Sequence, residues 1–264
     1  MATKVIRGIK IGFDDTGDGD ALVLIHGHPF DRSMWHPQTA AFGSQYRIIA
    51  PDLRGYGESE TNDEKTMLEE FARDIAALLD DLKVENIVLC GLSMGGQIAL
   101  AFYQLFPQKI RALILADTFA QLDDEERRQA RYDTAERLLR EGMDKYADEV
   151  LPKMIVAETI VEQPKVAAHV LSMMRGTSPK GAAAALRGRA ERSDYTPLLP
   201  EISVPTLIVV GSLDEFTPVR DAEFMRDRIP NSKMAVIEGA GHMPNLENPV
   251  EFNGIVAEFI KTLD

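Results

Sequence analysis

The sequence has 264 residues, 45% of them hydrophobic, so it is long enough for one large domain with a substantial core and too apolar for a disordered chain. Its formal net charge of −13 repels nucleic-acid phosphates, so nucleic acid is not an expected partner. The beginning MATKVIRGIKIGF has no long apolar core, and no segment approaches the roughly 18 apolar residues of a membrane span, so no membrane association is expected.

Short apolar runs rich in β-branched residues alternate along the chain with helical patterns. The runs predict strands at residues 5–13, 22–26, 47–51, 86–91, 112–116, 206–211 and 234–237. The helical patterns lie near residues 66–82, 94–106, 218–229 and 248–262. Nearly continuous apolar runs are expected where helices cover both faces of a mostly parallel sheet. The alternation therefore predicts an α/β fold with helices on both sides of a central sheet.

The segment 86–91 ends at Cys90 and Gly91, and GLSMGG at residues 91–96 then opens a helical pattern. A serine at the tip of a sharp strand-to-helix turn, with small residues two positions away on each side, is typical of a nucleophile elbow. The start of the helix directs free amides toward the place where an oxyanion would develop. We therefore predict Ser93 as a nucleophile, against the alternative of a simple glycine-rich turn.

Cys90 is the only cysteine, so no intrachain disulfide is possible and a reducing cytoplasm is the expected location. Its apolar surroundings predict a core residue rather than a reactive thiol.

Residues 118–195 interrupt the alternation with helical signals and no convincing strand. Acidic residues at 123–126 precede three arginines, which suits the dipole of a helix, and Ser178 followed by proline is a typical helix start. A helical insertion between parallel strands is typical of a lid at the carboxyl edge of the sheet. We predict a core of residues 1–117 and 196–264 with a helical lid at 118–195, a decoration without function being the alternative.

A serine hydroxyl needs a general base, which in this setting follows the serine in the chain. Of the five histidines, only His169 and His242 follow Ser93. His169 lies inside a helical pattern and is expected to be structural. His242 lies in GAGHMP, a loop directly after the last predicted strand, so we predict it as the base.

The base needs an orienting carboxylate, for which Asp214 is the first candidate because it follows the strand at 206–211. Glu215 is its neighbour in sequence. Asp117 ends the preceding strand, and adjacent strand ends can reach the same histidine. Asp117 therefore stays open as an alternative acid.

At this point the chain resembles the α/β-hydrolases over nearly its whole length outside residues 118–195. Three further segments carry the resemblance: HGHP at 26–29, DLRGYGES at 52–59, and GH at 241–242 followed by ENP at 247–249. The resemblance implies an oxyanion hole made of the backbone amides of Met94 and His28. It also implies that His26 forms structural hydrogen bonds and that residues 52–59 form a shaped loop without chemistry.

Within the family, the Gly-x-Ser-Met-Gly elbow and the layout of residues 118–195 are most similar to small carboxylesterases and 3-oxoadipate enol-lactonases. Residues 111–118 and the last part of the chain are also lactonase-like. Two features differ from the enol-lactonases: the HGHP loop, and a helical insertion without tryptophan, since Trp35 is the only one.

These residues predict hydrolysis of a small to medium, largely apolar ester through an acyl-enzyme, with no metal or organic cofactor. A lactone substrate is the main alternative; carbon–carbon bond hydrolysis and a receptor for a small molecule are further ones. Perhydrolase or haloperoxidase side activity is compatible with the same site. The expected partner is thus a small-molecule ester or lactone. Residues expected to line its cavity, or else to pack the insertion onto the sheet, are Met143, Tyr146, Met154, Met173 and Met174.

Overall fold

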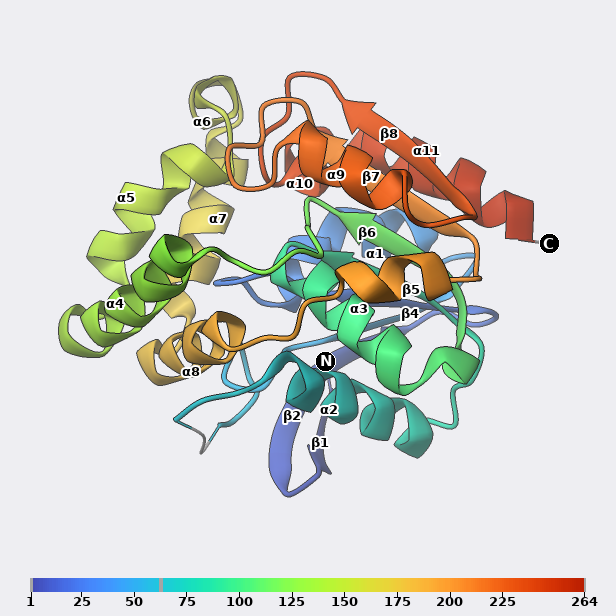
Figure 1. The fold of residues 1–264 in the computed structure, drawn as a ribbon, viewed down its shortest axis with the longest axis horizontal. Coiled ribbons are helices and arrows are strands. Elements are labelled where there is room, and N and C mark those ends of the chain that lie inside the picture. Colours follow the sequence, from blue (N-terminus) through green and yellow to red (C-terminus); the bar gives the residue numbers. More distant parts are fainter. Residues whose placement is uncertain (1, 62–63, 264) are drawn as a thin grey trace.

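The computed structural model describes residues 2–61 and 64–263, whose strands form one eight-stranded sheet (Figure 1). The strands are β1 (Ala2–Ile6), β2 (Ile9–Thr16), β3 (Ala21–Ile25), β4 (Arg47–Pro51), β5 (Ile87–Leu92), β6 (Ile110–Ala116), β7 (Thr206–Gly211) and β8 (Ser232–Ile237). Their spatial order is β1-β2-β4-β3-β5-β6-β7-β8. The pairs β1/β2 and β2/β4 are antiparallel and the other five pairs are parallel, which confirms the predicted mostly parallel sheet.

The single strand predicted at residues 5–13 is wrong, because the chain turns back within it. Ile6 pairs with Ile9 across a two-residue turn, in which Arg7 has a φ of 48° and Gly8 a φ of 84°. Two positive φ angles define the tight hairpin turn whose twist matches that of the strands. Because apolar residues alternate on both sides of the turn, the hairpin looks like one strand in the sequence. The other predicted strands agree with the structure to within two residues at each end.

Helices cover both faces of the sheet, as predicted (Figure 1). Helices α2 (Leu68–Asp81), α3 (Met94–Leu105) and α9 (Val219–Arg226) pack on one face, and α1 (His36–Phe42) and α11 (Pro249–Ile260) pack on the other. Neighbouring residues of a strand therefore belong to different apolar clusters. In β3, Val23 and Ile25 face α2 and α3, whereas Leu22 and Leu24 face α1 and α11. Burial on both faces explains why these strands are apolar throughout.

Residues 118–195, all of them described, form five helices between β6 and β7. They are α4 (Glu125–Glu141), α5 (Asp144–Met154), α6 (Ala157–Glu162), α7 (Pro164–Gly176) and α8 (Pro179–Ala190). The side chain of Ser178 accepts a hydrogen bond from the Gly181 amide and caps α8, as the sequence indicates. Figure 1 shows this helical block beside the carboxyl ends of the parallel strands.

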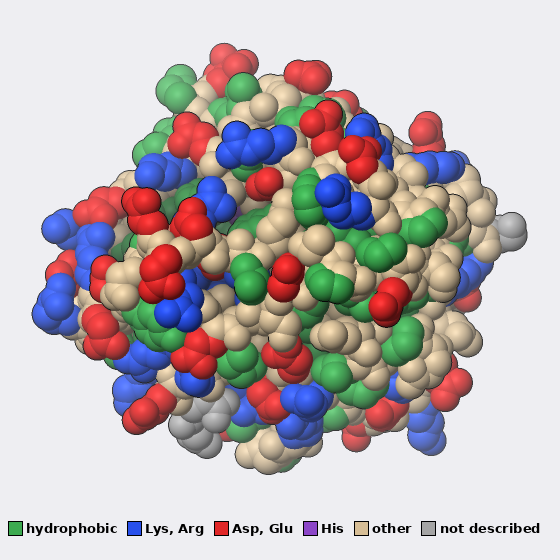
Figure 2. All heavy atoms as spheres, viewed as in Figure 1, with side chains coloured by type: hydrophobic (Ala, Val, Ile, Leu, Met, Phe, Trp, Pro, Cys, Tyr) green, Lys and Arg blue, Asp and Glu red, His purple; other side chains and the backbone are tan. Residues whose placement is uncertain are grey.

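None of the described helices combines the length and the apolar composition that crossing a bilayer requires. Acidic and basic side chains are interspersed over the face shown in Figure 2, including the part over α4 and α8. Cys90 is buried in β5 among apolar side chains, as predicted.

Candidate active site

Ser93 occupies a strained turn between β5 and α3. Its φ is 57°, which is uncommon for a residue other than glycine. A Cβ atom on Gly91 would lie 2.2 Å from the carbonyl oxygen of Gly95, and one on Gly95 would lie 2.2 Å from that of Ile25. Glycine is therefore required at both positions if the turn is to keep this shape. The strand–turn–helix geometry predicted for residues 91–96 is confirmed.

Three buried side chains from distant parts of the sequence form one hydrogen-bonded chain. Nε2 of His242 lies 2.9 Å from Oγ of Ser93, and Nδ1 of His242 lies 2.7 Å from Oδ2 of Asp214. Each of the three residues is at most 8% exposed. The serine follows β5, the aspartate follows β7 and the histidine follows β8, so the carboxyl edge of the sheet brings them together.

The surroundings of Asp214 keep it ionised. Its Oδ1 accepts hydrogen bonds from the amides of Phe216 at 2.8 Å and Thr217 at 3.1 Å, and its Oδ2 accepts one from the Thr217 hydroxyl. Burial alone would raise the pKa of Asp214, but attraction to His242 and the hydrogen bonds from His242 and Thr217 outweigh it and lower that pKa to about 2.

Asp117 lies beside this chain but is not hydrogen-bonded to His242. Its Oδ1 accepts a hydrogen bond from the Gly211 amide at 2.9 Å, and its Oδ2 has no partner among the described residues. Burial raises the pKa of Asp117 well above its usual range, and the nearby charge of Asp214 raises it further. These effects favour the protonated form of Asp117, and the carboxylate bonded to His242 is Asp214.

The ligand atoms of Asp117, Asp214 and His242 lie within 4.8 Å of one another, a spacing that a metal ion could use. Their atoms are already engaged, because His242 bonds Ser93 and Asp214, while Asp117 bonds a backbone amide and favours its protonated form. This donor set fits a hydrogen-bonded relay better than a cation site.

The two amides that the family resemblance assigns to an oxyanion hole belong to Met94 and His28. Met94 is the first residue of α3, and His28 follows β3, the strand adjacent to β5. Among the residues that the structure describes, neither amide donates a hydrogen bond. Both donors are therefore available to a ligand near Ser93.

Hydrogen bonds from the loop at residues 52–59 hold the segment that contains His28. The Leu53 amide donates to Nε2 of His26 at 2.9 Å, and the Tyr56 hydroxyl lies 2.8 Å from Nδ1 of His28. The structural role expected for His26 agrees with these contacts. The loop shapes the site, although none of its side chains belongs to the Ser93 relay.

Ser93 and His242 line a cavity of about 290 Å³ between the sheet edge and the helical block. Side chains of the helical block that line it include Phe119, Arg131, Tyr146, Met154, Leu186 and Arg189. Arg189 is buried and was not among the residues predicted to line the cavity. Nothing in the pattern of α8 distinguishes it from Arg187, whose side chain pairs with Glu136 at the surface.

The expectation of a largely apolar, methionine-lined cavity is wrong in part. Met154 and Tyr146 line the cavity, but Met143, Met173 and Met174 are buried in apolar clusters that hold the helical block together and onto the core. Helical periodicity shows which residues face inward, but it does not distinguish a cavity wall from a packed interface.

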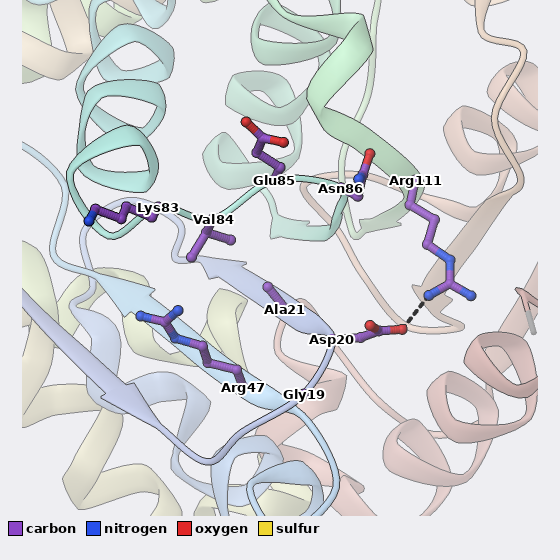
Figure 3. Close-up of a pocket in the computed structure, with 9 residues that line it drawn as sticks. All are labelled: Gly19, Asp20, Ala21, Arg47, Lys83, Val84, Glu85, Asn86 and Arg111. Carbon is purple, nitrogen blue, oxygen red and sulfur yellow. Dashed lines mark hydrogen bonds and ion pairs between the residues drawn. The ribbon is translucent and has the colours of Figure 1, made fainter.

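A second depression, of about 570 Å³, lies at the opposite edge of the sheet (Figure 3). Its residues come from the start of β3 and from the segment before β5, and its arginines are paired with carboxylates: Arg47 with Asp15 and Arg111 with Asp20. Figure 3 shows no serine or histidine among the residues drawn. The candidate chemistry therefore lies in the cavity at Ser93.

The fold and the arrangement of Ser93, His242 and Asp214 are those of a known family of proteins. A family model described as alpha/beta hydrolase fold matches residues 20–249, so the chain belongs to the α/β-hydrolase family.

Its relatives include esterases and enol-lactonases, as the sequence resemblance indicates. A thermophilic esterase from Thermogutta terrifontis has a TM-score of 0.96 and 38% identity, over 99% of this chain and 98% of that chain. The enol-lactonase from Burkholderia xenovorans LB400 has a TM-score of 0.92 and 27% identity, over 98% and 100% of the two chains. 3-Oxoadipate enol-lactonase 1 of Acinetobacter baylyi is 32% identical over 257 residues, which are 97% of this chain and 94% of that protein.

Proposed function

We propose that this protein is a serine hydrolase that cleaves small to medium carboxylic esters through an acyl-enzyme intermediate. The observation that carries the proposal is the unbroken chain of hydrogen bonds from Ser93 through His242 to Asp214, at the wall of a cavity of about 290 Å³. A volume of this size accommodates a small organic molecule.

In the proposed reaction His242 removes the proton of Ser93 as Oγ attacks the ester carbonyl, and Asp214 holds the imidazole in the productive tautomer. The amides of Met94 and His28 stabilise the negative charge that develops on the carbonyl oxygen. Each such donor contributes about 2.7–4 kcal/mol to lowering the barrier. His242 then protonates the leaving alcohol, and water attacks the acyl-enzyme by the same route, releasing the acid and restoring Ser93.

The helical block at residues 118–195 acts in this proposal as a lid on the core of residues 1–117 and 196–264. Its support is that α4, α5 and α8 supply side chains to the wall of the cavity opposite Ser93. A lid of this kind excludes water from the reacting atoms and selects the substrate.

A lactone is the second candidate substrate, because curated relatives that match nearly the whole chain are 3-oxoadipate enol-lactonases at 29% and 32% identity. The same residues would open a cyclic ester, with the leaving alcohol still attached to the acyl group. Rates with enol-lactones and γ-lactones, compared with open-chain esters of equal size, decide between the two substrates.

The test of the hydrolase itself is turnover of p-nitrophenyl acetate and butyrate by the wild type and by Ser93→Ala. We expect the substitution to lower kcat/KM by at least about 10³-fold, because it removes the nucleophile. A fluorophosphonate should add one covalent label to Ser93 in the wild type and none in the variant. Comparable hydrolysis by both proteins would refute the role of Ser93.

A further inference from the structure

Arg189 is a buried cation that faces the cavity without an acidic partner. It lies near the end of α8, is 7% exposed and lines the cavity that contains Ser93 and His242. Within the part of the chain that the structure describes, its one hydrogen bond runs from Nε to the side-chain oxygen of Gln97, at 3.1 Å. No carboxylate among the described residues pairs with its guanidinium.

Asp123, an acidic side chain whose charge acts on Arg189, is already bonded to two other arginines. Asp123 receives two hydrogen bonds from Arg131, at 2.6 and 3.0 Å, and one from Arg192 at 2.9 Å. The charges of three arginines, Arg131, Arg192 and Arg189, thus act on one carboxylate. Two of them bond it, which leaves Arg189 as a charge without a partner.

An unpaired charge of this kind is costly to bury, and arginine does not escape the cost by losing its proton. Burial lowers the pKa of Arg189 well below its usual range, and the neighbouring charges of Arg131 and Arg192 lower it further. An anion in the cavity would offset both the burial of the Arg189 charge and its repulsion by Arg131 and Arg192.

A second unpaired donor faces the same cavity. Burial and the charges of Arg189 and Arg131 lower the pKa of His28 well below its usual range, so its ring is neutral and carries one proton. The buried Tyr56 hydroxyl has no other acceptor among the described residues, so it donates to Nδ1 of His28. We therefore assign the ring proton to Nε2, an atom without a hydrogen-bond partner among the described residues.

The opposing charge at the cavity is small. Among the described residues that line it, Glu215 is the one acid and is exposed, whereas Arg127, Arg131 and Arg189 are basic; of these, Arg131 is paired with Asp123. The electrostatic field inside therefore favours a negatively charged molecule.

We propose that Arg189, with Nε2 of His28 as a second donor, binds a carboxylate carried by the substrate, so that the preferred esters are anionic. This inference rests on the proposed function, because it places the carboxylate within the same cavity as the ester bond. Gln97, the partner of Arg189, lies four residues after Ser93 on α3, about 6 Å along the helix axis. A short carbon chain between carboxylate and ester therefore suits the site.

The test compares esters that differ only in charge. One pair carries the charge on the acyl part, monoethyl glutarate against ethyl 4-carbamoylbutanoate, and a second carries it on the alcohol part, 4-acetoxybutanoate against 4-acetoxybutanamide. In the wild type we expect kcat/KM for the carboxylate of at least one pair to exceed that of its amide by about 10- to 100-fold, as for a charge-assisted hydrogen bond. The responding pair identifies which part of the substrate occupies the subsite.

Arg189→Gln should bring the ratio of kcat/KM for the carboxylate to that for its amide down to about one, and Arg189→Lys should restore part of the preference. Arg187→Gln is the matched control, because it removes the same charge from the same helix at a side chain outside the cavity. It should keep the full preference. Thermal unfolding establishes that each variant is folded.

Binding of glutarate to Ser93→Ala, measured by calorimetry, tests the subsite without turnover. We expect binding that is at least about 10-fold weaker when Arg189→Gln is added. Equal rates for both members of both pairs, or a preference that survives in Arg189→Gln, would overturn the anion subsite and leave the hydrolase intact. If the wild type cleaved no ester at all, the proposed function would fail, and the glutarate measurement alone would decide the subsite.

Discussion

Asp117 and Asp214 are two buried carboxyl groups at the ends of neighbouring strands, and their surroundings shift their pKa values in opposite directions. Asp214 accepts hydrogen bonds from two amides, a hydroxyl and His242, which together favour its ionised form. Asp117 accepts one hydrogen bond, from an amide, and is close to the negative charge of Asp214, which favours the protonated form of Asp117. Two acids of the same type can thus share one site without repelling each other.

This difference predicts unequal effects of removing each charge on activity. Asp214→Asn should lower kcat/KM for p-nitrophenyl butyrate by about 10⁴-fold, because the amide favours the wrong tautomer of His242. Asp117→Asn should retain at least about a tenth of the wild-type value, because Asp117 bonds the Gly211 amide and is not hydrogen-bonded to His242. Loss of activity in Asp117→Asn with Asp214→Asn intact would reverse the two assignments.

The raised pKa of Asp117 also predicts how stability depends on pH. The folded protein holds this proton to a higher pH than the unfolded chain does, so Asp117 costs stability as the pH rises above its unfolded pKa of about 3.9, until the folded pKa is reached. Within that window the cost grows by up to about 1.4 kcal/mol per pH unit. The free energy of unfolding of Asp117→Asn, relative to wild type, should therefore increase from pH 5 to pH 8; a constant difference would contradict a raised pKa.

The sequence predicts the location of a site residue where that location depends on its place between two elements. Ser93 follows a strand and opens a helix, and His242 follows the last strand, so both could be placed before any contact was known. The sequence favoured Asp214 as the acid but left Asp117 as an alternative, because each ends a strand at the same sheet edge. Arg189 was not predicted, because Asp123 bonds Arg131 and Arg192 instead of Arg189 only in the folded helical block. No local sequence pattern encodes that choice.

At the scale of elements, the turn between β5 and α3 depends on close backbone contact. Gly91→Ala would place a Cβ 2.2 Å from the carbonyl oxygen of Gly95, so the turn must shift. We expect a loss of about 1–3 kcal/mol in unfolding free energy and a fall in kcat of at least about 100-fold, because Ser93 moves away from His242.

Gly254→Ala is the matched control for this substitution. Gly254 lies inside α11, and a Cβ there has no atom within 4 Å. This change should leave kcat unaltered and raise the unfolding free energy by about 0.4–1 kcal/mol. Unchanged activity in Gly91→Ala would show that the turn tolerates displacement, contrary to the packing described here.

The sequence predicts best the long elements in which apolar residues recur with a clear period. Helices α2, α3, α9 and α11 and the central strands were predicted, since burial on one helix face or on both sheet faces leaves a clear apolar pattern. The hairpin of β1 and β2 was read as one strand because its turn has only two residues. Helix α1 was not predicted, since its seven residues give too short a pattern.

In the whole molecule, the helical block and the core share both apolar and polar contacts. Met173 and Met174 of α7 belong to the same buried cluster as Trp35 and residues of β3 and β5. Glu247, beside the His242 loop, accepts hydrogen bonds from the Val156 amide at 2.8 Å and the Thr159 hydroxyl at 3.0 Å. It also accepts one from the Gly241 amide at 2.8 Å, so one carboxylate connects the block with the loop that carries the base.

These shared contacts predict that the helical block and the core unfold together. Trp35 is the only tryptophan and is fully buried. It belongs to the apolar cluster that contains residues of β3 and β5, so its fluorescence reports on the core. Far-UV circular dichroism reports on all helices, including the five of the block. In a urea titration the two signals should change with the same midpoint and slope. A dichroism change that precedes the fluorescence change would instead mean that residues 118–195 unfold as a separate unit, and the lid would then be held more loosely than its contacts imply.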